Sequence, residues 1–178
     1  YKYNDDLFAK VTTLPGATNH GLVIFLDWSG SMAHNLTGTL NQLYNLVWFC
    51  NRTKIPFEVF AFSDRWDATS RYDHNPKPVN DFKSGDMVIK GQLLQFFSSK
   101  MSVKDQNTMM HNLYMMGQRW GYRNWRQNGY PYEPTTKLNL GSTPLNDAIV
   151  MAMDIIPAFQ SATGVQKIHT VFLTDGAS

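Results

Sequence analysis

The sequence has little cysteine, little net charge and no long apolar run, and each of these narrows what the protein can be. Its 178 residues include a single cysteine, Cys50, so no disulfide can form within the chain, and a reducing, cytoplasmic setting is favoured. The formal net charge of +2 is too small to argue for binding to nucleic acid or to a membrane surface. Because no apolar run approaches the roughly 20 residues that a membrane helix needs, we expect no membrane partner.

Several catalytic signatures are also missing. The sequence contains no Gly-Lys-Ser/Thr phosphate loop, no Gly-x-Gly-x-x-Gly turn and no His-Glu-x-x-His pattern. A phosphoryl-transfer site of the haloacid dehalogenase kind needs a second acid two residues after the aspartate that ends the first strand. Here Ser29 stands in that place. We therefore expect no catalytic residues and favour a binding role.

What the sequence does contain is a short buried strand followed by a polar turn. Leu22–Leu26 is an unbroken apolar run, which is typical of a strand buried on both faces of a parallel sheet. Asp27, Ser29 and Ser31 follow at alternating positions, and Gly30 permits a tight turn. Open α/β sheets bind ligands at the carboxyl ends of their strands, and carboxylate and hydroxyl oxygens suit Mg²⁺ or Mn²⁺. This turn is therefore a candidate metal site.

Helical and strand patterns alternate after this turn. An apolar stripe at three- and four-residue steps predicts a helix that ends at residues 51–52, and residues 57–62 predict a second buried strand. Together with the first strand they form a right-handed βαβ unit. We expect a short helix over 91–100, and then a longer helix that begins with a capping box at Ser102 and ends near Gly117 or Gly121. The stripe of the first helix consists of Leu36, Leu40, Leu43, Val47 and Cys50.

The last third of the chain predicts one more helix and one more strand. Pro144 suits the first helical position, and Ser142 or Thr143 suits the N-cap. A third strand over 168–173 is closed by Thr-Asp-Gly, which contains Asp175. The predicted fold class is a doubly wound, mostly parallel α/β sheet with helices on both faces. The stripe of the last helix consists of Leu145, Ala148, Ile149, Ala152, Met153 and Ile156.

Three predicted loops bring oxygen ligands to the same edge of this sheet. Asp27, Ser29 and Ser31 come from the first loop, Thr143 from the second and Asp175 from the third. Mg²⁺ takes about six oxygens and usually keeps some waters, so five protein groups, some acting through water, suit it. The alternative is that these side chains only cap turns and helix ends, and for Thr143 both roles stay open.

Two further acidic residues stand near these loops in the sequence. Asp64 follows the second strand, and we interpret it as lining the rim of the site. Asp147 lies in the first turn of the last helix, where we interpret it as a solvated helix charge.

The three loops resemble the metal-ion-dependent adhesion site of von Willebrand factor A (VWA) domains. The resemblance implies that Ser29 and Ser31 bind the metal directly and that Thr143 binds it directly or through water. Asp27 and Asp175 would act mainly through water or from outside the inner coordination shell, and a carboxylate of a partner protein would complete the coordination. The segments that carry the resemblance are Asp27-x-Ser29-x-Ser31, Gly141-Ser142-Thr143-Pro144-Leu145 and Thr174-Asp175-Gly176.

Within this superfamily the sequence looks closest to intracellular proteins of the cobaltochelatase and magnesium-chelatase type, including CobT-like proteins of large tailed phages. The similar segments are 27–32, 57–62 and 141–149. The resemblance implies that proteins of this kind partner an AAA+ ATPase ring and help to insert a divalent metal into a tetrapyrrole, and that their VWA part is not itself the catalyst.

The same resemblance implies a domain organisation. Residues 1–20 would be an irregular lead-in, and residues 21–178 a VWA-like domain that is incomplete at its C-terminal end. A helical insertion at about 86–137 would separate the second strand from Thr143 and would set this chain apart from compact adhesive VWA domains.

Two other functions stay open at this point. An extracellular adhesive or ligand-binding VWA domain would use the same metal site. Contact with nucleic acid could use residues 119–126, where arginines alternate with aromatic side chains. We favour a structural role for that stretch, in which the arginines cap helix ends or stack on tryptophan, over nucleic-acid binding. A protein-interaction surface is a third possibility for it.

Overall fold

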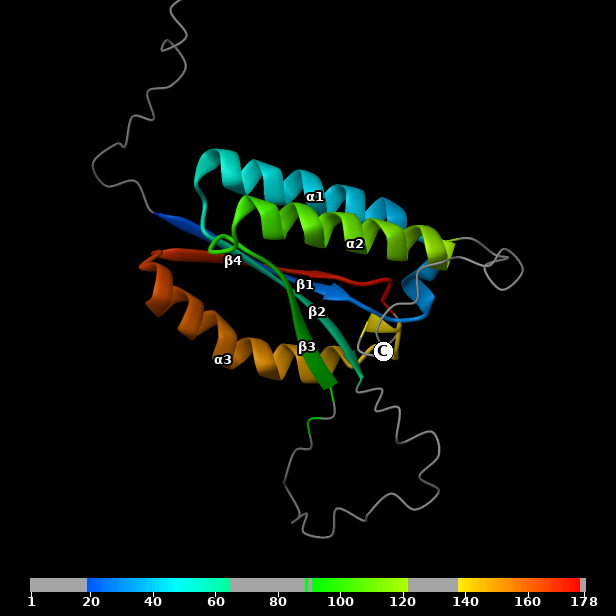
Figure 1. Cartoon of the computed structure of the whole chain (residues 1–178). Coiled ribbons are helices and arrows are strands. Elements are labelled where there is room, and N and C mark those ends of the chain that lie inside the picture. The colour runs from blue at the N-terminus through cyan, green and yellow to red at the C-terminus, as the bar shows by residue number, and fades with distance from the viewer. Residues whose placement is uncertain (1–18, 65–88, 90, 122–137, 177–178) are drawn as a thin grey trace, which may run out of the picture.

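The computed structural model describes residues 19–64, 89, 91–121 and 138–176, and these form a sheet with helices on both faces (Figure 1). The four strands lie in the order β3-β2-β1-β4. The central strand β1 runs parallel to both of its neighbours, β2 and β4, whereas β3 pairs with β2 in the antiparallel direction. The chain therefore has a mixed α/β fold with a mostly parallel sheet. The strands are β1 (His20–Asp27), β2 (Phe57–Asp64), β3 (Gly91–Ser98) and β4 (Lys167–Leu173).

Two helices cover one face of the sheet and one helix covers the other (Figure 1). Alternate residues of β1 divide between the two layers. Ile24 and Leu26 pack in the core beneath α1 and α2, whereas Val23 and Phe25 pack in the core over α3. The prediction that this strand is buried on both faces is confirmed. The helices are α1 (Leu36–Thr53), α2 (Val103–Gly121) and α3 (Leu145–Thr163), and a short 3-10 helix, η2 (Ser31–His34), precedes α1.

The predictions of α1 and α2, the two helices that share one face of the sheet, are confirmed. All five stripe residues of α1 are buried, and the helix ends at Thr53, where Lys54 adopts the left-handed conformation (φ 59°). Burial also raises the pKa of the Cys50 thiol. Ser102 makes the capping hydrogen bond expected of it, because its hydroxyl accepts from the Asp105 amide at 3.1 Å. The same hydroxyl donates to the Asp105 carboxylate at 2.7 Å.

The short helix expected over 91–100 is wrong, because β3 occupies Gly91–Ser98. Two apolar doublets separated by Gln95 fit a helix face as well as a strand that is covered on both faces. The β2–β3 pairing shifts register at Phe96, so that Phe96 and Phe97 both enter the core on the α1 and α2 side. The buried Glu58 of β2 accepts a hydrogen bond from the Ser98 hydroxyl at 2.9 Å, which fixes this pairing.

The stripe expected on α3 is correct only in part. Ala148 and Ala152 are buried together with Phe159, but Ile149 is 45% exposed and Met153 is 69% exposed. Each of these two residues follows a buried alanine and therefore lies about 100° further around the helix, away from the sheet. The helix also continues through Pro157 to Thr163.

Some predictions fall on residues that the structure does not describe. Of the lead-in expected over 1–20, only the last two residues are described, and His20 already belongs to β1. Residues 122–126 of the arginine and aromatic stretch lie outside the described ranges. Within the described part, the Arg119 guanidinium lies 5.7 Å from the centre of the Trp120 ring.

Candidate metal centre

The first and second predicted loops lie side by side beyond the carboxyl end of β1. Ser29 and Gly141 form a parallel bridge outside the named strands. The Gly30 amide donates to the Gly141 carbonyl at 2.9 Å, and the Gly141 amide donates to the Trp28 carbonyl at 3.1 Å. The backbone therefore holds the turn that carries Ser29 and Ser31 against the segment that leads to Thr143.

Hydroxyl groups connect the first loop to the third. The Oγ atoms of Ser29 and Ser31 lie 2.9 Å apart and share a hydrogen bond. The Ser31 hydroxyl also donates to Oδ1 of Asp175 at 3.0 Å, although 144 residues separate the two in the chain. A continuous line of oxygen atoms thus runs from the end of β1 to the end of β4.

The Asp27 carboxylate lies at the centre of the site and is fully buried. Its Oδ2 accepts a hydrogen bond from the Thr174 hydroxyl at 2.8 Å, whereas its Oδ1 has no hydrogen-bond partner in the described part of the chain. Burial raises the pKa of Asp27 above its ordinary value of 3.8, and the nearby charge of Asp175 raises it further. The hydroxyls of Ser29, Thr174 and Thr143 lower this pKa, but by less than burial raises it.

Thr143 faces this carboxylate and does not cap α3. Its hydroxyl is close enough to lower the pKa of Asp27. The helix begins at Leu145 with Pro144 at the N-cap, and no side chain makes a capping hydrogen bond there. The expected N-cap role of Thr143 or Ser142, with Pro144 at the first helical position, is therefore wrong. The physical reason is that the Thr143 hydroxyl is engaged with the buried Asp27 carboxylate.

The structure thus brings all five predicted residues together at one edge of the sheet, and their role as metal ligands stays a prediction. An ionised carboxylate with one orphaned, buried oxygen is costly unless a cation or donor neutralises it. Two carboxylates and three hydroxyls form an oxygen-only donor set, which fits Mg²⁺ or Mn²⁺. The described residues contain no group of three or more His, Cys, Asp or Glu that could hold a metal ion, so this candidate depends on its hydroxyls.

Two residues that organise the site, Trp28 and Thr174, are not among the residues that the sequence singles out as ligands. Trp28 is fully buried, its indole N–H donates to the Leu138 carbonyl at 2.9 Å, and its ring meets Phe96 edge-on. Thr174 belongs to the Thr-Asp-Gly motif, and its hydroxyl donates the hydrogen bond to Oδ2 of Asp27. A tryptophan in the middle of a polar turn was the available signal for Trp28, because so large an apolar side chain is seldom left in water.

The two acidic residues interpreted as peripheral both bind backbone amides. Oδ1 of Asp64 accepts from the Ser142 amide at 2.6 Å, which gives the residue a definite partner beyond lining the rim. Oδ2 of Asp147 accepts from the Gly91 amide at 2.7 Å, so its interpretation as a solvated helix charge is wrong.

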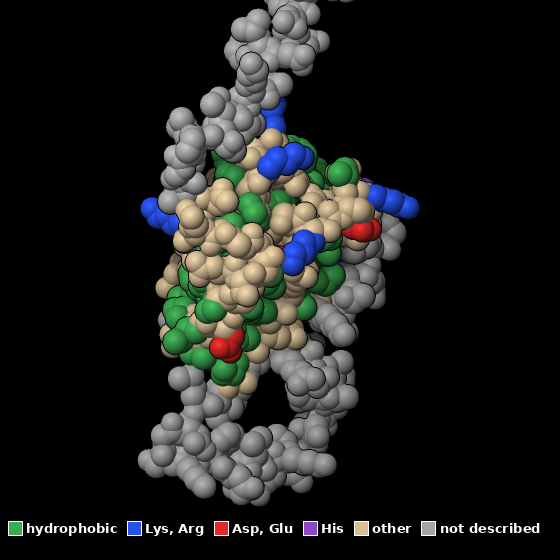
Figure 2. All heavy atoms as spheres, turned by 90° about the vertical axis from the view of Figure 1, so that its left-hand side faces the viewer, with side chains coloured by type: hydrophobic (Ala, Val, Ile, Leu, Met, Phe, Trp, Pro, Cys, Tyr) green, Lys and Arg blue, Asp and Glu red, His purple; other side chains and the backbone are tan. Residues whose placement is uncertain are grey.

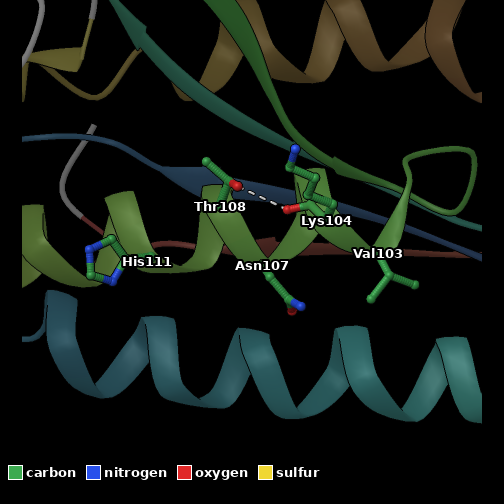
Figure 3. Close-up of a pocket in the computed structure, with 5 residues that line it drawn as sticks. All are labelled: Val103, Lys104, Asn107, Thr108 and His111. Carbon is green, nitrogen blue, oxygen red and sulfur yellow. Dashed lines mark hydrogen bonds between the residues drawn. The ribbon is translucent and has the colours of Figure 1, made fainter.

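Two hollows on the described surface lie away from this edge. One runs along α2 and is lined by Val103, Lys104, Asn107, Thr108 and His111 (Figure 3). There the Thr108 hydroxyl is already bonded to the Lys104 carbonyl at 2.9 Å. A smaller apolar hollow of about 250 Å³ lies beside His20 and His169, at the opposite end of β1 from Asp27. Neither gathers charged groups as the Asp27 site does.

Figure 2 shows the side of the molecule on which β1 begins, and the Lys and Arg side chains there stand apart from one another among apolar and polar atoms. Within the described residues, no helix is long and apolar enough to cross a membrane.

Comparison of the chain with protein-family models, with curated proteins and with solved structures finds no match. Any function must therefore be argued from the site itself.

Proposed function

We propose that this chain is a metal-dependent protein-interaction module of the VWA type. The observation that carries the proposal is the orphaned Oδ1 of Asp27, which is buried beside the hydroxyls of Ser29 and Thr143 and near the charge of Asp175. Mg²⁺ or Mn²⁺ would be held there by these residues together with Ser31. The bound ion would supply an electrophilic position for an oxygen ligand from outside the chain.

The chemistry of the donor set indicates what that outside ligand is. Three of the five donors are neutral hydroxyls, and burial favours the protonated form of Asp27 when no cation is present. A divalent ion bound here keeps a strong preference for a further hard, anionic oxygen. The carboxylate of an acidic side chain on a partner protein meets this preference, so we propose such a partner.

The finer part of the proposal rests on the sequence resemblance. The partner would be an AAA+ ATPase subunit in a cytoplasmic complex of the cobaltochelatase or magnesium-chelatase type, and this chain would be its interaction subunit without catalytic residues of its own. The parallel order of β2, β1 and β4 and the loops at their carboxyl ends are compatible with that proposal.

Metal titration by calorimetry tests the core of the proposal. We expect Mn²⁺ and Mg²⁺ to bind the wild type and not the Ser29→Ala/Ser31→Ala variant. The Ser99→Ala/Ser161→Ala variant is the matched control, because it removes two exposed hydroxyls far from the site and should bind as the wild type does. Equal binding of metal by all three proteins would mean that Ser29 and Ser31 are not ligands and that the loops are only capped turns.

A second titration tests the carboxylate ligand. With Mn²⁺ present, free glutamate should bind the wild type and should lose that binding when EDTA removes the metal. A folded wild type that binds metal but shows no metal-dependent carboxylate binding would contradict the proposed partner chemistry. Capture of an ATPase subunit that depends on Mn²⁺ and on Ser29 and Ser31 would then test the finer assignment.

A further inference from the structure

The backbone that delivers Thr143 to the site is held from one side by a residue outside the five predicted ligands. Asp64 is the last residue of β2, two positions beyond the Asp27–Phe62 pair of the sheet. Its Oδ1 accepts a hydrogen bond from the Ser142 amide at 2.6 Å. Ser142 is the residue directly before Thr143, so this contact fixes the Gly141–Ser142 peptide plane, from which the chain continues into Thr143.

The segment around Thr143 has few other restraints. The Gly141 backbone pairs with the Trp28 turn on one side, and on the other the first amide of α3, that of Leu145, bonds to the Thr143 carbonyl at 2.9 Å. No side chain caps the helix. Among the described residues of the sheet, Asp64 is the one whose side chain bonds to the backbone directly before Thr143.

A second carboxylate strengthens the same attachment. Asp147, in the first turn of α3, accepts the Gly91 amide at 2.7 Å, and Gly91 is the β3 partner of Asp64. A Cβ atom on Gly91 would lie 3.0 Å from Cβ of Asp147, so the two backbones approach closely. The stretch from Ser142 to Asp147 is thus tied at both ends to the same end of the β2–β3 pair.

We propose that Asp64 is a positioning residue of the metal site, which holds the Ser142 amide so that the Thr143 hydroxyl stays beside Asp27. This inference rests on the proposed function. Asp64 acts through the backbone of its neighbour and does not need to touch the ion. What matters is the acceptor oxygen of its side chain and not its charge.

Two substitutions separate these roles. Asp64→Asn keeps an acceptor oxygen for the Ser142 amide and removes the charge, whereas Asp64→Ala removes both. Loss of a residue that orients a metal ligand typically weakens metal binding about 10- to 100-fold. In Mn²⁺ calorimetry we expect Asp64→Ala to weaken binding in that range and Asp64→Asn to stay close to the wild type. Asp154→Ala, which removes an exposed carboxylate of α3, is the charge-matched control and should have no effect.

The outcomes that overturn the proposal are specific. If Asp64→Asn weakens Mn²⁺ binding as much as Asp64→Ala, the residue acts by its charge. If Asp64→Ala binds Mn²⁺ as the wild type does, it has no role in the site. A double-mutant cycle adds a third condition, since Asp64→Ala should cost little once Thr143→Ala is present. Independent, additive losses would mean that Asp64 does not act through Thr143.

A metal-free measurement distinguishes failure of this inference from failure of the proposed function. Hydrogen exchange of the Ser142 amide in EDTA should be faster in Asp64→Ala than in the wild type, Asp64→Asn and Asp154→Ala. If the wild type binds no Mn²⁺, the proposed function fails, and this exchange rate alone decides whether Asp64 positions the loop. Unchanged exchange in Asp64→Ala would overturn the inference in either case.

Discussion

The Thr174 hydroxyl donates a 2.8 Å hydrogen bond to Oδ2 of Asp27 across 147 residues of sequence. The same oxygen of Thr174 accepts the Gly176 amide at 3.1 Å. One hydroxyl group therefore joins the ends of the parallel neighbours β1 and β4 and also shapes the turn that carries Asp175. With Oδ2 engaged in this way, Oδ1 is the oxygen of Asp27 that is left for a cation.

This relationship predicts that Thr174→Val destabilises the metal-free protein. Valine has nearly the shape of threonine but cannot donate, so Oδ2 of the buried Asp27 loses its partner. We expect a loss of about 1–3 kcal/mol in the free energy of unfolding, measured by urea denaturation in EDTA. Thr174→Ser keeps the hydroxyl and should retain most of the stability. A valine variant as stable as the wild type would show that the hydrogen bond contributes nothing.

The raised pKa of Asp27 predicts that ionisation of this carboxyl group lowers the stability of the metal-free protein. Because burial raises this pKa in the folded protein, the folded state holds the proton to a higher pH than the unfolded chain does. Without metal, the wild type should therefore lose stability relative to Asp27→Asn as the pH rises from about 3.8, the ordinary value, through the raised pKa. Above that pKa the difference should stay constant. Urea denaturation of both proteins in EDTA over a pH series measures this difference. A wild type that keeps or gains stability relative to Asp27→Asn as the pH rises through this range would contradict the prediction.

At neutral pH, bound metal should restore the stability that the metal-free protein loses when Asp27 is ionised. A ligand that binds only the folded state at 100 times its dissociation constant adds about 2.7 kcal/mol of stability. We expect Mg²⁺ to raise the thermal midpoint of the wild type and to leave those of Asp27→Asn and Ser29→Ala/Ser31→Ala unchanged. An equal rise in all three proteins would indicate that the ion acts elsewhere on the chain.

The parts of the fold that follow from local pattern were predictable from the sequence. The run from Leu22 to Leu26 is apolar at every position, and such a run, closed by a polar turn, is typical of a strand covered on both faces. The α1 stripe and the Ser102 cap are equally local, because helical spacing and capping are set within one or two turns. The structure confirms these elements.

The predictions are wrong where contacts with other elements determine the structure or the burial of a residue. Phe96 and Phe97 read as part of a helix face because adjacent apolar residues do not fit strand alternation, and only the bulge against β2 explains them. The apolar side chain of Met153 favours a place in the buried stripe, but the residue is exposed, because the face of α3 that packs on the sheet is the one that carries Ala148 and Ala152.

The candidate site shows the same division. The oxygen-bearing residues could be selected from the sequence because they follow strand ends, and parallel strand ends share an edge. The connections among them could not be predicted, since a hydrogen bond such as that between Asp64 and the Ser142 amide depends on how two loops approach one another. Thr143 illustrates this limit, because its sequence context favours an N-cap while its neighbour in space is Asp27.

The buried position of Trp28 predicts that a substitution there lowers both the stability of the protein and its affinity for metal. Its indole N–H bonds to the Leu138 carbonyl at 2.9 Å, and its ring meets Phe96 at a centroid distance of 5.0 Å. Trp28→Phe removes the indole N–H, leaves part of the volume of the indole ring empty and leaves the Leu138 carbonyl without this hydrogen bond. We expect it to lower the free energy of unfolding by about 1–3 kcal/mol in urea denaturation. Because the Trp28 carbonyl also binds the Gly141 amide, the second loop should loosen and Mn²⁺ binding should weaken in the same variant.

Trp48→Phe is the matched control for this substitution, since Trp48 is 57% exposed on α1 and should tolerate phenylalanine with little change in stability or metal affinity. If both variants lose the same stability, the effect belongs to the aromatic exchange and not to the buried position of Trp28. If Trp28→Phe is destabilised but binds Mn²⁺ as the wild type does, the second loop keeps its place without the tryptophan. The attachment of Thr143 would then depend on the backbone bridge at Gly141 and on Asp64.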